Sequence, residues 1–306
     1  MMQMDRIETG TMQLRGEMKQ LEPMSRHTSW RVGGVAEHFY RPVDVADLQQ
    51  LLQQLPAHEP LFWLGLGSNL LVRDGGIRGT VICTSGVLNA IEWLENNRVY
   101  VEVGVASPQV ARQTARRGLQ GAEFLCGIPG TFGGALAMNA GAMGGETWNI
   151  VESVKVIDRR GELKTRGADE FETGYRHVRG KQGEWFVAAT LQLEAGNAGQ
   201  SLQQIKQHLA RRGSTQPTSQ PNAGSVFRNP PGDYAARLIE QCGLKNTCIG
   251  GACVSEKHAN FIINTGTATA RDIELLIQRV ADKVQQASGI ELVREVQIVG
   301  EPHEHD

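Results

Sequence analysis

The sequence predicts an α+β protein of two or three domains, and three observations support this prediction. The chain has 306 residues, which is more than a single hydrophobic core normally accommodates. Stretches with apolar residues at helical spacing are interspersed with strand-like alternation. Finally, 36 residues are glycine, and 16 of these lie between Gly65 and Gly145. With only 11 prolines and no Gly-X-Y repeat, this excess indicates a backbone that turns sharply or lies close to a ligand.

The first part of the chain predicts a helix followed by two short strands. Apolar residues recur at helical spacing over residues 45–55. The apolar run Leu61–Leu64 is followed by a glycine-containing segment, residues 65–69, and then by Leu70–Val72. This order predicts a strand, a tight turn and a second strand.

The middle of the chain predicts a strand, a helix and two further strands. Valine alternates with other residues over 99–105, which is typical of a strand. Ser107 and Pro108 provide an N-cap and a first helical residue, and that helix should end at Gly118. The two further strands are expected over residues 151–157 and 185–193.

The last third follows a short polar stretch, residues 194–200, which we interpret as a linker. Thr269 and Asp272 resemble a capping box, and the helix that they begin should stop before Gly289. Two other helices and two strands are expected here, over residues 202–212, 234–242, 259–263 and 292–299.

Composition and charge argue against several classes of protein. A net charge of -2 and a pI of about 6.5 give no general electrostatic basis for binding nucleic acid. No apolar run approaches the roughly 18 residues of a membrane span, and residues 1–20 lack the apolar region of a signal peptide. We therefore expect a cytoplasmic protein without membrane insertion, with a loosely ordered N-terminus and no obligatory protein partner.

The five cysteines favour neither a disulfide framework nor a metal site. Their number is odd and no CxxC motif occurs. The sequence also contains no HExxH motif. We therefore expect buried free thiols and no metal. The cysteines are Cys83, Cys126, Cys242, Cys248 and Cys253.

Two glycine-rich segments are candidate ligand sites. Residues 65–69 contain GxG after a strand, but the third glycine and the helix of a dinucleotide fingerprint are missing. This segment is either a plain hairpin turn or a turn that offers backbone N–H groups to a pyrophosphate. Residues 127–141 are either a tight helix crossing or a wall against a large flat ligand. Two such segments some 60 residues apart favour one extended cofactor that carries phosphates.

Three polar residues outside these segments are candidates for chemistry, and each has a structural alternative. Ser225 follows a glycine in a polar loop, but Phe227 replaces the second glycine of a nucleophile elbow. Its hydroxyl could donate a proton or cap the next element. Arg176 could hold a carboxylate or form a surface ion pair. Glu295 could point into a cleft or into solvent.

The order of these motifs resembles the UDP-N-acetylenolpyruvoylglucosamine reductase (MurB) family, flavoenzymes of peptidoglycan synthesis. The resemblance extends from about Met24 to Glu295. It rests on residues 27–34, 65–70, 127–134, 139–141, 175–176, 223–230, 238–245 and 255–261.

The resemblance implies non-covalent FAD in a fold of the vanillyl-alcohol-oxidase or PCMH type. It divides the chain into an N-terminal extension (1–23), two FAD-binding subdomains (24–95 and 96–195) and a substrate-binding domain (200–306). The residues that it places at the cofactor are Arg31, Gly65, Gly67, Ser68, Asn69, Leu70, Gly127, Ile128, Pro129, Gly130, Thr131, Gly133, Gly134, Asn139 and Gly141.

The implied reaction reduces UDP-N-acetylglucosamine-enolpyruvate to UDP-N-acetylmuramate with NADPH as the hydride donor. By the resemblance, Ser225 is the proton donor, and Arg176 and Glu295 polarise the substrate carboxylate. Further substrate contacts are implied at Tyr175, Asn229 and Lys245. The alternative is a flavin-dependent oxidase on the same cofactor-binding scaffold, against which the motif at 224–230 and Glu295 argue.

The sequence departs from the family pattern near two of these positions. His177 and Val178 stand where a small polar pair is usual, and Asn246 stands where glycine is usual. The interval between Arg176 and Ser225 is also short. It lacks the insertion with a tyrosine that one branch of the family places over the substrate, which indicates the shorter branch.

Overall fold

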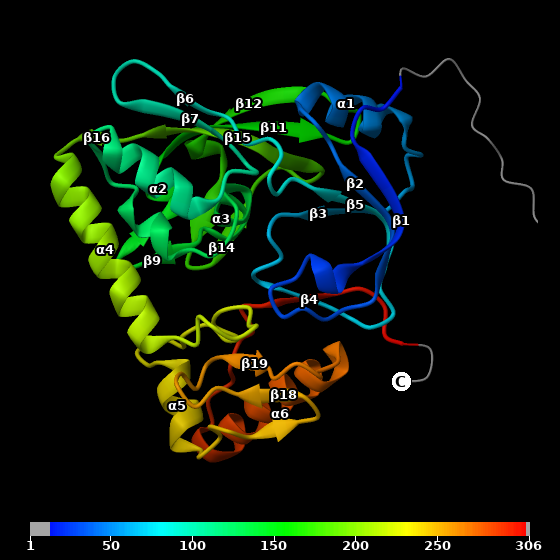
Figure 1. The fold of residues 1–306 in the computed structure, drawn as a ribbon, viewed down its shortest axis with the longest axis vertical. Coiled ribbons are helices and arrows are strands. Elements are labelled where there is room, and N and C mark those ends of the chain that lie inside the picture. Colours follow the sequence, from blue (N-terminus) through cyan, green and yellow to red (C-terminus); the bar gives the residue numbers. More distant parts are fainter. Residues whose placement is uncertain (1–12, 304–306) are drawn as a thin grey trace, which may run out of the picture.

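The computed structural model describes residues 13–303 and contains three groups of secondary structure (Figure 1). The first group is a four-stranded sheet, in which β2 and β3 run parallel to β5 and β1 runs antiparallel to β2. Its elements are β1 (Glu17–Pro23), η1 (Met24–Arg26), β2 (Val35–Arg41), α1 (Val45–Gln54), β3 (Leu61–Leu64) and β5 (Ile77–Cys83). The predicted loosely ordered start lies largely outside the described residues, whereas 17–23 form β1.

The second group is a five-stranded antiparallel sheet in the order β12-β11-β15-β7-β6. Its strands are β6 (Ile91–Trp93), β7 (Arg98–Glu102), β11 (Val151–Asp158), β12 (Leu163–Gly167) and β15 (Glu184–Gln192). Helices α2 (Ser107–Arg116) and α3 (Phe132–Met138) share one hydrophobic core with it. Short elements complete the group: β8 (Leu119–Gln120), η2 (Glu123–Gly127), β9 (Gly141–Ala142), β10 (Gly145–Glu146), η3 (Thr147–Ile150), η4 (Ala168–Glu170), β13 (Glu172–Gly174), β14 (His177–Arg179) and β16 (Glu194–Ala195).

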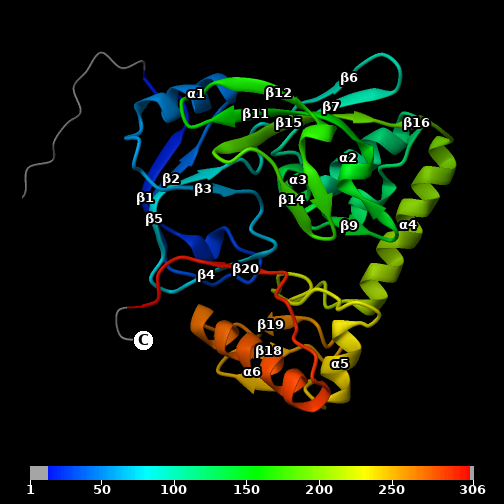
Figure 2. The ribbon, with the colours of Figure 1, turned by 180° about the vertical axis from the view of Figure 1, so that it is seen from behind.

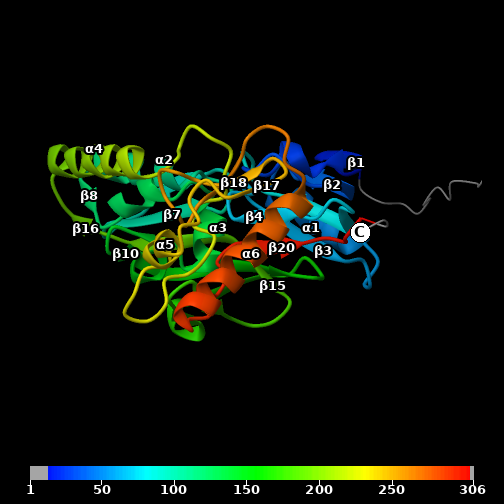
Figure 3. The same ribbon diagram turned by 90° about the horizontal axis from the view of Figure 1, so that it is seen from below.

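The third group contains the C-terminal helices and a three-stranded sheet. Helix α4 runs along the side of the molecule from the second group to the third (Figure 1). Figure 3 shows α4 and β1 at opposite ends of the molecule. The elements are α4 (Ala198–Thr215), α5 (Ala235–Gln241), β17 (Cys248–Ile249), β18 (Ala252–Val254), β19 (Ile262–Asn264), α6 (Ala270–Ser288) and β20 (Gln297–Val299).

The C-terminal strand returns to the first third of the chain. β20 pairs in parallel with β4 (Leu70–Val72), which follows the 65–69 turn (Figure 2). The fully buried Trp30 donates from Nε1 to the Ile262 carbonyl at 2.7 Å. The third group is therefore packed directly against the N-terminal part of the chain.

Most predicted elements are confirmed, with shifts at their ends. The capping box of Thr269 and Asp272 begins α6, and Gly289 ends it with a φ of 73°. Ser107, the predicted N-cap, is instead the first residue of α2, and Ala106 is the N-cap. Of the predicted strand 292–299, only Gln297–Val299 forms a regular strand, while Arg294 forms an isolated antiparallel bridge with Phe227.

One interpretation of the sequence is wrong, and one of two open alternatives is excluded. Residues 194–200 are no linker, because Glu194 and Ala195 pair with β8, and α4 begins at Ala198. The turn 65–69 does not close a hairpin, because β3 pairs with β5 while β4 pairs with β20. The hairpin alternative for this turn is thereby removed.

The cysteine prediction is partly wrong. Cys248 and Cys253 form a disulfide, because they lie directly opposite each other in the β17–β18 hairpin. Cys83 and Cys126 are buried free thiols as expected, and Cys242 is free and half-buried. Within residues 13–303 no cluster of His, Cys, Asp or Glu could hold a metal ion. No helix in the same range is long and apolar enough to cross a membrane.

Candidate active site

The two glycine-rich segments contact each other. A methyl group added at Gly65 would overlap the Thr131 hydroxyl, and one added at Gly130 would lie 3.0 Å from Ser68 Oγ. The segments 65–69 and 127–134 therefore lie against each other, and a side chain at Gly65 would displace the Thr131 hydroxyl. This contact supports one shared binding surface rather than two unrelated turns.

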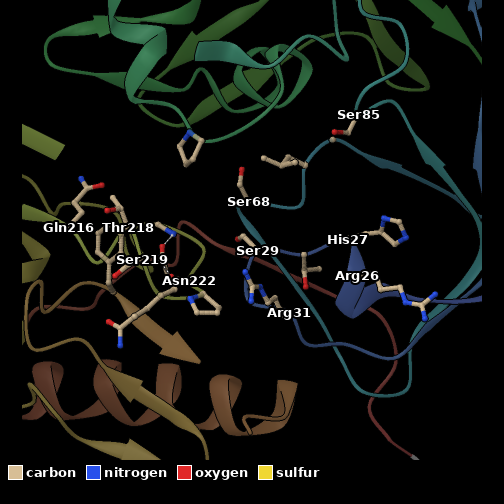
Figure 4. A pocket seen from close by; sticks show the side chains of 18 of the residues that line it. Arg26, His27, Ser29, Arg31, Ser68, Ser85, Gln216, Thr218, Ser219 and Asn222 are labelled. Carbon is tan, nitrogen blue, oxygen red and sulfur yellow. Dashed lines mark hydrogen bonds between the residues drawn. The ribbon is translucent and has the colours of Figure 1, made fainter. Parts of the chain in front are cut away.

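Two cavities meet at this contact, and Gly65 lines both of them. The first cavity, of about 530 Å³, lies between the N-terminal part of the chain and the loop 216–222 (Figure 4). The second, of about 330 Å³, lies between β3 and α3. Of the predicted cofactor residues, Arg31, Gly65, Ser68 and Pro129 line the first cavity, and Gly65, Thr131, Gly133 and Gly134 line the second.

The first cavity is positively charged. Among the described residues that line it, none is Asp or Glu, whereas Arg26, Arg31, Arg41 and Arg212 do line it. Arg212 is buried enough for desolvation to lower its pKa. A cavity with this lining suits phosphate groups, so an elongated cofactor with a pyrophosphate fits the residues present.

Other predicted cofactor residues shape the site without lining these cavities. Asn69 donates from Nδ2 to the Glu295 carbonyl at 3.1 Å. Asn139 is buried in a left-handed conformation and donates to Glu146 and to the Gly174 carbonyl, each at 3.0 Å. Others lie in the turns and elements around them, namely Gly67, Leu70, Gly127, Ile128 and Gly141.

Arg176 and Glu295 form a half-buried ion pair. Arg176 lies at the turn of the β13–β14 hairpin, with a φ of 54°. Its Nε donates to Glu295 Oε1 at 2.8 Å, and the two side chains are 16% and 17% exposed. The remaining guanidinium nitrogens donate to the carbonyls of Asn139 at 3.4 Å and Gly141 at 2.9 Å.

The environment of Glu295 favours its protonated form. Burial raises the pKa of Glu295 above its ordinary value, and this effect exceeds the opposing charges of Arg176 and Arg228. A protonated carboxylic acid can donate a hydrogen bond as well as accept one. In its protonated form, Glu295 would not repel an anionic oxygen held in the site.

Ser225 lies beside the segment that carries Glu295. It follows Gly224, which lines the first cavity, and precedes Val226, whose carbonyl accepts from the Glu295 N–H at 2.8 Å. The structure shows no hydrogen bond from the half-buried Ser225 hydroxyl to the described residues. Arg176 and Glu295 are thus in direct contact. Ser225 is the residue before Val226, which is hydrogen-bonded to the backbone of Glu295.

The predicted substrate residues are less closely grouped. Tyr175 is 46% exposed, and the centroid of its ring lies 5.0 Å from Arg176 Cζ. Asn229 accepts from the Ala235 N–H at 3.2 Å, at the start of α5. Lys245 pairs with Glu240 at 2.5 Å, and among the described residues it makes no hydrogen bond or ion pair with Arg176 or Glu295.

The departures from the family pattern have visible consequences. Val178 lines the second cavity. Asn246 adopts a left-handed conformation with a φ of 61°, which asparagine tolerates better than most other non-glycine residues. This explains how the chain keeps the turn after Lys245 without glycine.

Three arginines near the site, Arg41, Arg212 and Arg228, were not predicted from the sequence as functional residues. Arg41 and Arg212 belong to helix and strand ends, where arginine is usually a solvated residue. Arg228 lies within the 224–230 motif. Its importance follows from the pairing of this motif with the segment that carries Glu295, which the sequence does not show.

The glycine-lined cavities and the fold define a class of protein, the FAD-binding flavoproteins. Residues 36–167 match the family model described as "FAD binding domain". Residues 216–299 match the model described as "UDP-N-acetylenolpyruvoylglucosamine reductase, C-terminal domain". The chain therefore combines an FAD-binding domain with a C-terminal domain of one particular reductase.

Comparison with whole proteins gives the same result. The chain is 59% identical over 286 residues to the UDP-N-acetylenolpyruvoylglucosamine reductase of Alkalilimnicola ehrlichii, covering 94% of this chain and 96% of that protein. It is 59% identical to the reductase of the same name from Methylococcus capsulatus, covering 94% of each. The crystal structure of the Thermus caldophilus reductase superposes with a TM-score of 0.77 at 32% identity, covering 93% of this chain and 98% of that one.

The chain belongs to the UDP-N-acetylenolpyruvoylglucosamine reductase family. The predicted α+β fold, with an FAD-binding part and a separate C-terminal domain, is confirmed. The protein is an FAD-binding oxidoreductase. The C-terminal match argues against the alternative of an oxidase with a different final domain.

Proposed function

We propose that this enzyme reduces UDP-N-acetylglucosamine-enolpyruvate to UDP-N-acetylmuramate in peptidoglycan synthesis, with NADPH as the hydride donor. Family membership supports the substrate. The observation that carries the proposal is the half-buried Arg176–Glu295 pair next to Ser225. FAD, when bound, supplies a hydride acceptor and donor between NADPH and the substrate.

We assign the cofactor to the glycine-lined surface. Ser68 and the segments around Gly65 and Gly130 would hold the pyrophosphate, because their backbone can approach a ligand closely. The positive first cavity offers further stabilisation for phosphate oxygens. In the proposed division, residues 24–95 and 96–195 bind the cofactor and residues 200–306 bind the substrate. We place the enzyme in the cytoplasm.

The residues of the site match the charge changes of the reaction. Hydride addition at the terminal carbon of the enolpyruvyl group places negative charge on the adjacent carbon and its carboxylate. Arg176 and a protonated Glu295 would stabilise that charge by preorganised hydrogen bonds. The Ser225 hydroxyl would then give its proton to the carbon.

The substitution Ser225→Ala tests the assignment of the proton donor. Flavin reduction by NADPH under anaerobic conditions should keep its wild-type rate, because no substrate proton is involved. Reoxidation by the enolpyruvyl substrate should slow by about 10²- to 10⁴-fold, as is typical for loss of general acid catalysis. Stopped-flow absorbance of the flavin measures both half-reactions.

The matched control is Ser214→Ala, which removes an exposed hydroxyl at the end of α4. It should leave both half-reactions unchanged. Wild-type reoxidation in the Ser225→Ala enzyme would show that another group donates the proton. If NADPH did not reduce the flavin of the wild-type enzyme, NADPH would be excluded as the hydride donor.

A further inference from the structure

Arg228 lies on the same face of a short antiparallel ladder as Glu295. The Arg228 N–H donates to the Val293 carbonyl at 2.9 Å, and the Glu295 N–H donates to the Val226 carbonyl at 2.8 Å. Phe227 and Arg294 form the bridge between these two bonds. In such a ladder, opposite residues share a face and residues two apart return to it. Arg228 and Glu295 are therefore diagonal neighbours, within reach of a long side chain.

The guanidinium of Arg228 has unused donors. Its Nε is buried and has no hydrogen-bond partner among residues 13–303. By contrast, each guanidinium nitrogen of Arg176 donates to Glu295 or to a carbonyl of the chain. A buried donor without a partner is costly in a folded protein. Of the two arginines beside Glu295, Arg228 is thus the one with guanidinium donors available for a ligand.

The balance of charge around Glu295 favours an anion. Arg176 and Arg228 both act on this single carboxyl group, whose burial favours its neutral form. This carboxyl group can compensate at most one of the two positive charges. A carboxylate offers two oxygens to the planar guanidinium in a bidentate arrangement.

We propose that Arg228 binds the carboxylate of the enolpyruvyl substrate, as a second guanidinium beside Arg176. This inference rests on the proposed function. It assigns Arg228 to the carboxylate rather than to the diphosphate because of its position. Arg228 lies three residues after Ser225 and beside Glu295, where the carbon next to that carboxylate must be protonated.

The test compares two ligands that differ in the carboxylate. UDP-N-acetylmuramate carries it, whereas UDP-N-acetylglucosamine carries the same nucleotide diphosphate without it. In FAD-loaded Arg228→Met enzyme, calorimetry should show binding of UDP-N-acetylmuramate weakened by about 10- to 100-fold, as for loss of a charge-assisted pair of hydrogen bonds. Binding of UDP-N-acetylglucosamine should stay at the wild-type value.

Two further variants define the result. Arg228→Lys keeps the charge but lacks the planar fork, so it should bind UDP-N-acetylmuramate with intermediate affinity. Arg294→Met, the control, removes an exposed arginine from the opposite face of the same ladder and should bind both ligands normally. If Arg228→Met does not retain flavin, the lysine variant carries the same two-ligand comparison.

Two outcomes would overturn the inference. Normal binding of both ligands by flavin-containing Arg228 variants would show that Arg228 contacts neither. Equal weakening of both ligands would place Arg228 at the nucleotide diphosphate instead. Failure of the proposed function is distinguishable from both, because the wild-type enzyme itself would then not bind UDP-N-acetylmuramate or turn over the enolpyruvyl substrate.

Discussion

The Glu295 side and the Arg176 side of the candidate active site are held by very different amounts of structure. On the Glu295 side, β20 pairs with the buried strand β4, and Asn69 exchanges hydrogen bonds with the backbone of Glu295 and Gln297. Trp30 fixes the C-terminal domain to the same region. On the Arg176 side, the two-stranded hairpin β13–β14 has mostly exposed or half-buried residues.

This difference separates two tasks. The carboxyl group is positioned by buried backbone pairing, so substitutions there should act on stability. The guanidinium is positioned by a small hairpin and by its own hydrogen bonds to Asn139, Gly141 and Glu295. Substitutions on the hairpin should therefore act on the reaction with little effect on folding.

The largest expected effect on this comparison comes from Trp30. Trp30→Ala removes a fully buried ring and leaves the Ile262 carbonyl without its donor. The free energy of unfolding should fall by about 3–5 kcal/mol. Thr173→Ala, an exposed change in β13, should alter it by less than about 0.5 kcal/mol. Urea unfolding measures both, and equal losses would remove the distinction between the two sides.

Arg176→Met tests the hairpin side. Reoxidation of the flavin by the enolpyruvyl substrate should slow by about 10²- to 10³-fold, as for loss of a donor to a developing anion. Thermal unfolding and flavin reduction by NADPH should stay near their wild-type values. Arg179→Met, an exposed arginine on the same hairpin, is the control and should leave all three unchanged. A large loss of stability in Arg176→Met would instead make this ion pair a structural element.

The sequence predicted the local elements well because they depend on nearby residues. The capping box at Thr269 and the glycine stop at Gly289 are local signals, and both occur as expected. The grouping of Arg176 and Glu295, by contrast, depends on contacts between residues 119 positions apart. Periodicity carries no information about such contacts, and only the family resemblance brought these residues together before the structure did.

The incorrect predictions have the same origin. The turn 65–69 is locally compatible with a hairpin, but its second strand pairs with residues 297–299 at the other end of the chain. The interpretation of residues 194–200 as a linker is wrong, because Glu194 and Ala195 pair with β8. Cys248 and Cys253 are five residues apart, and only the β17–β18 register places them opposite each other. Each error concerns pairing, which propensity alone does not specify.

The protonation of Glu295 offers the smallest and most discriminating test of the comparison. Because burial raises its pKa in the folded state above the ordinary value of 4.5, the native protein binds this proton more tightly than the unfolded chain. The stabilising contribution is complete below pH 4.5 and is lost as the pH rises through the folded-state pKa. The side chain introduced by Glu295→Gln stays neutral at every pH. As the pH rises from 4.5 through the folded-state pKa of Glu295, the free energy of unfolding of this variant should therefore increase relative to that of the wild type.

Urea unfolding at several pH values between 4.5 and 7.5 measures this gain, with Glu291→Gln as a control for the change in charge at an exposed position. One further variant distinguishes the contributions of the Arg176 side and the Glu295 side. Removing Arg176 takes away the largest influence that lowers the pKa of Glu295, so Arg176→Met should move the window to higher pH. An unmoved window would mean that the hairpin exerts no electrostatic control over the acid, and that the buried Glu295 side alone determines when it is protonated.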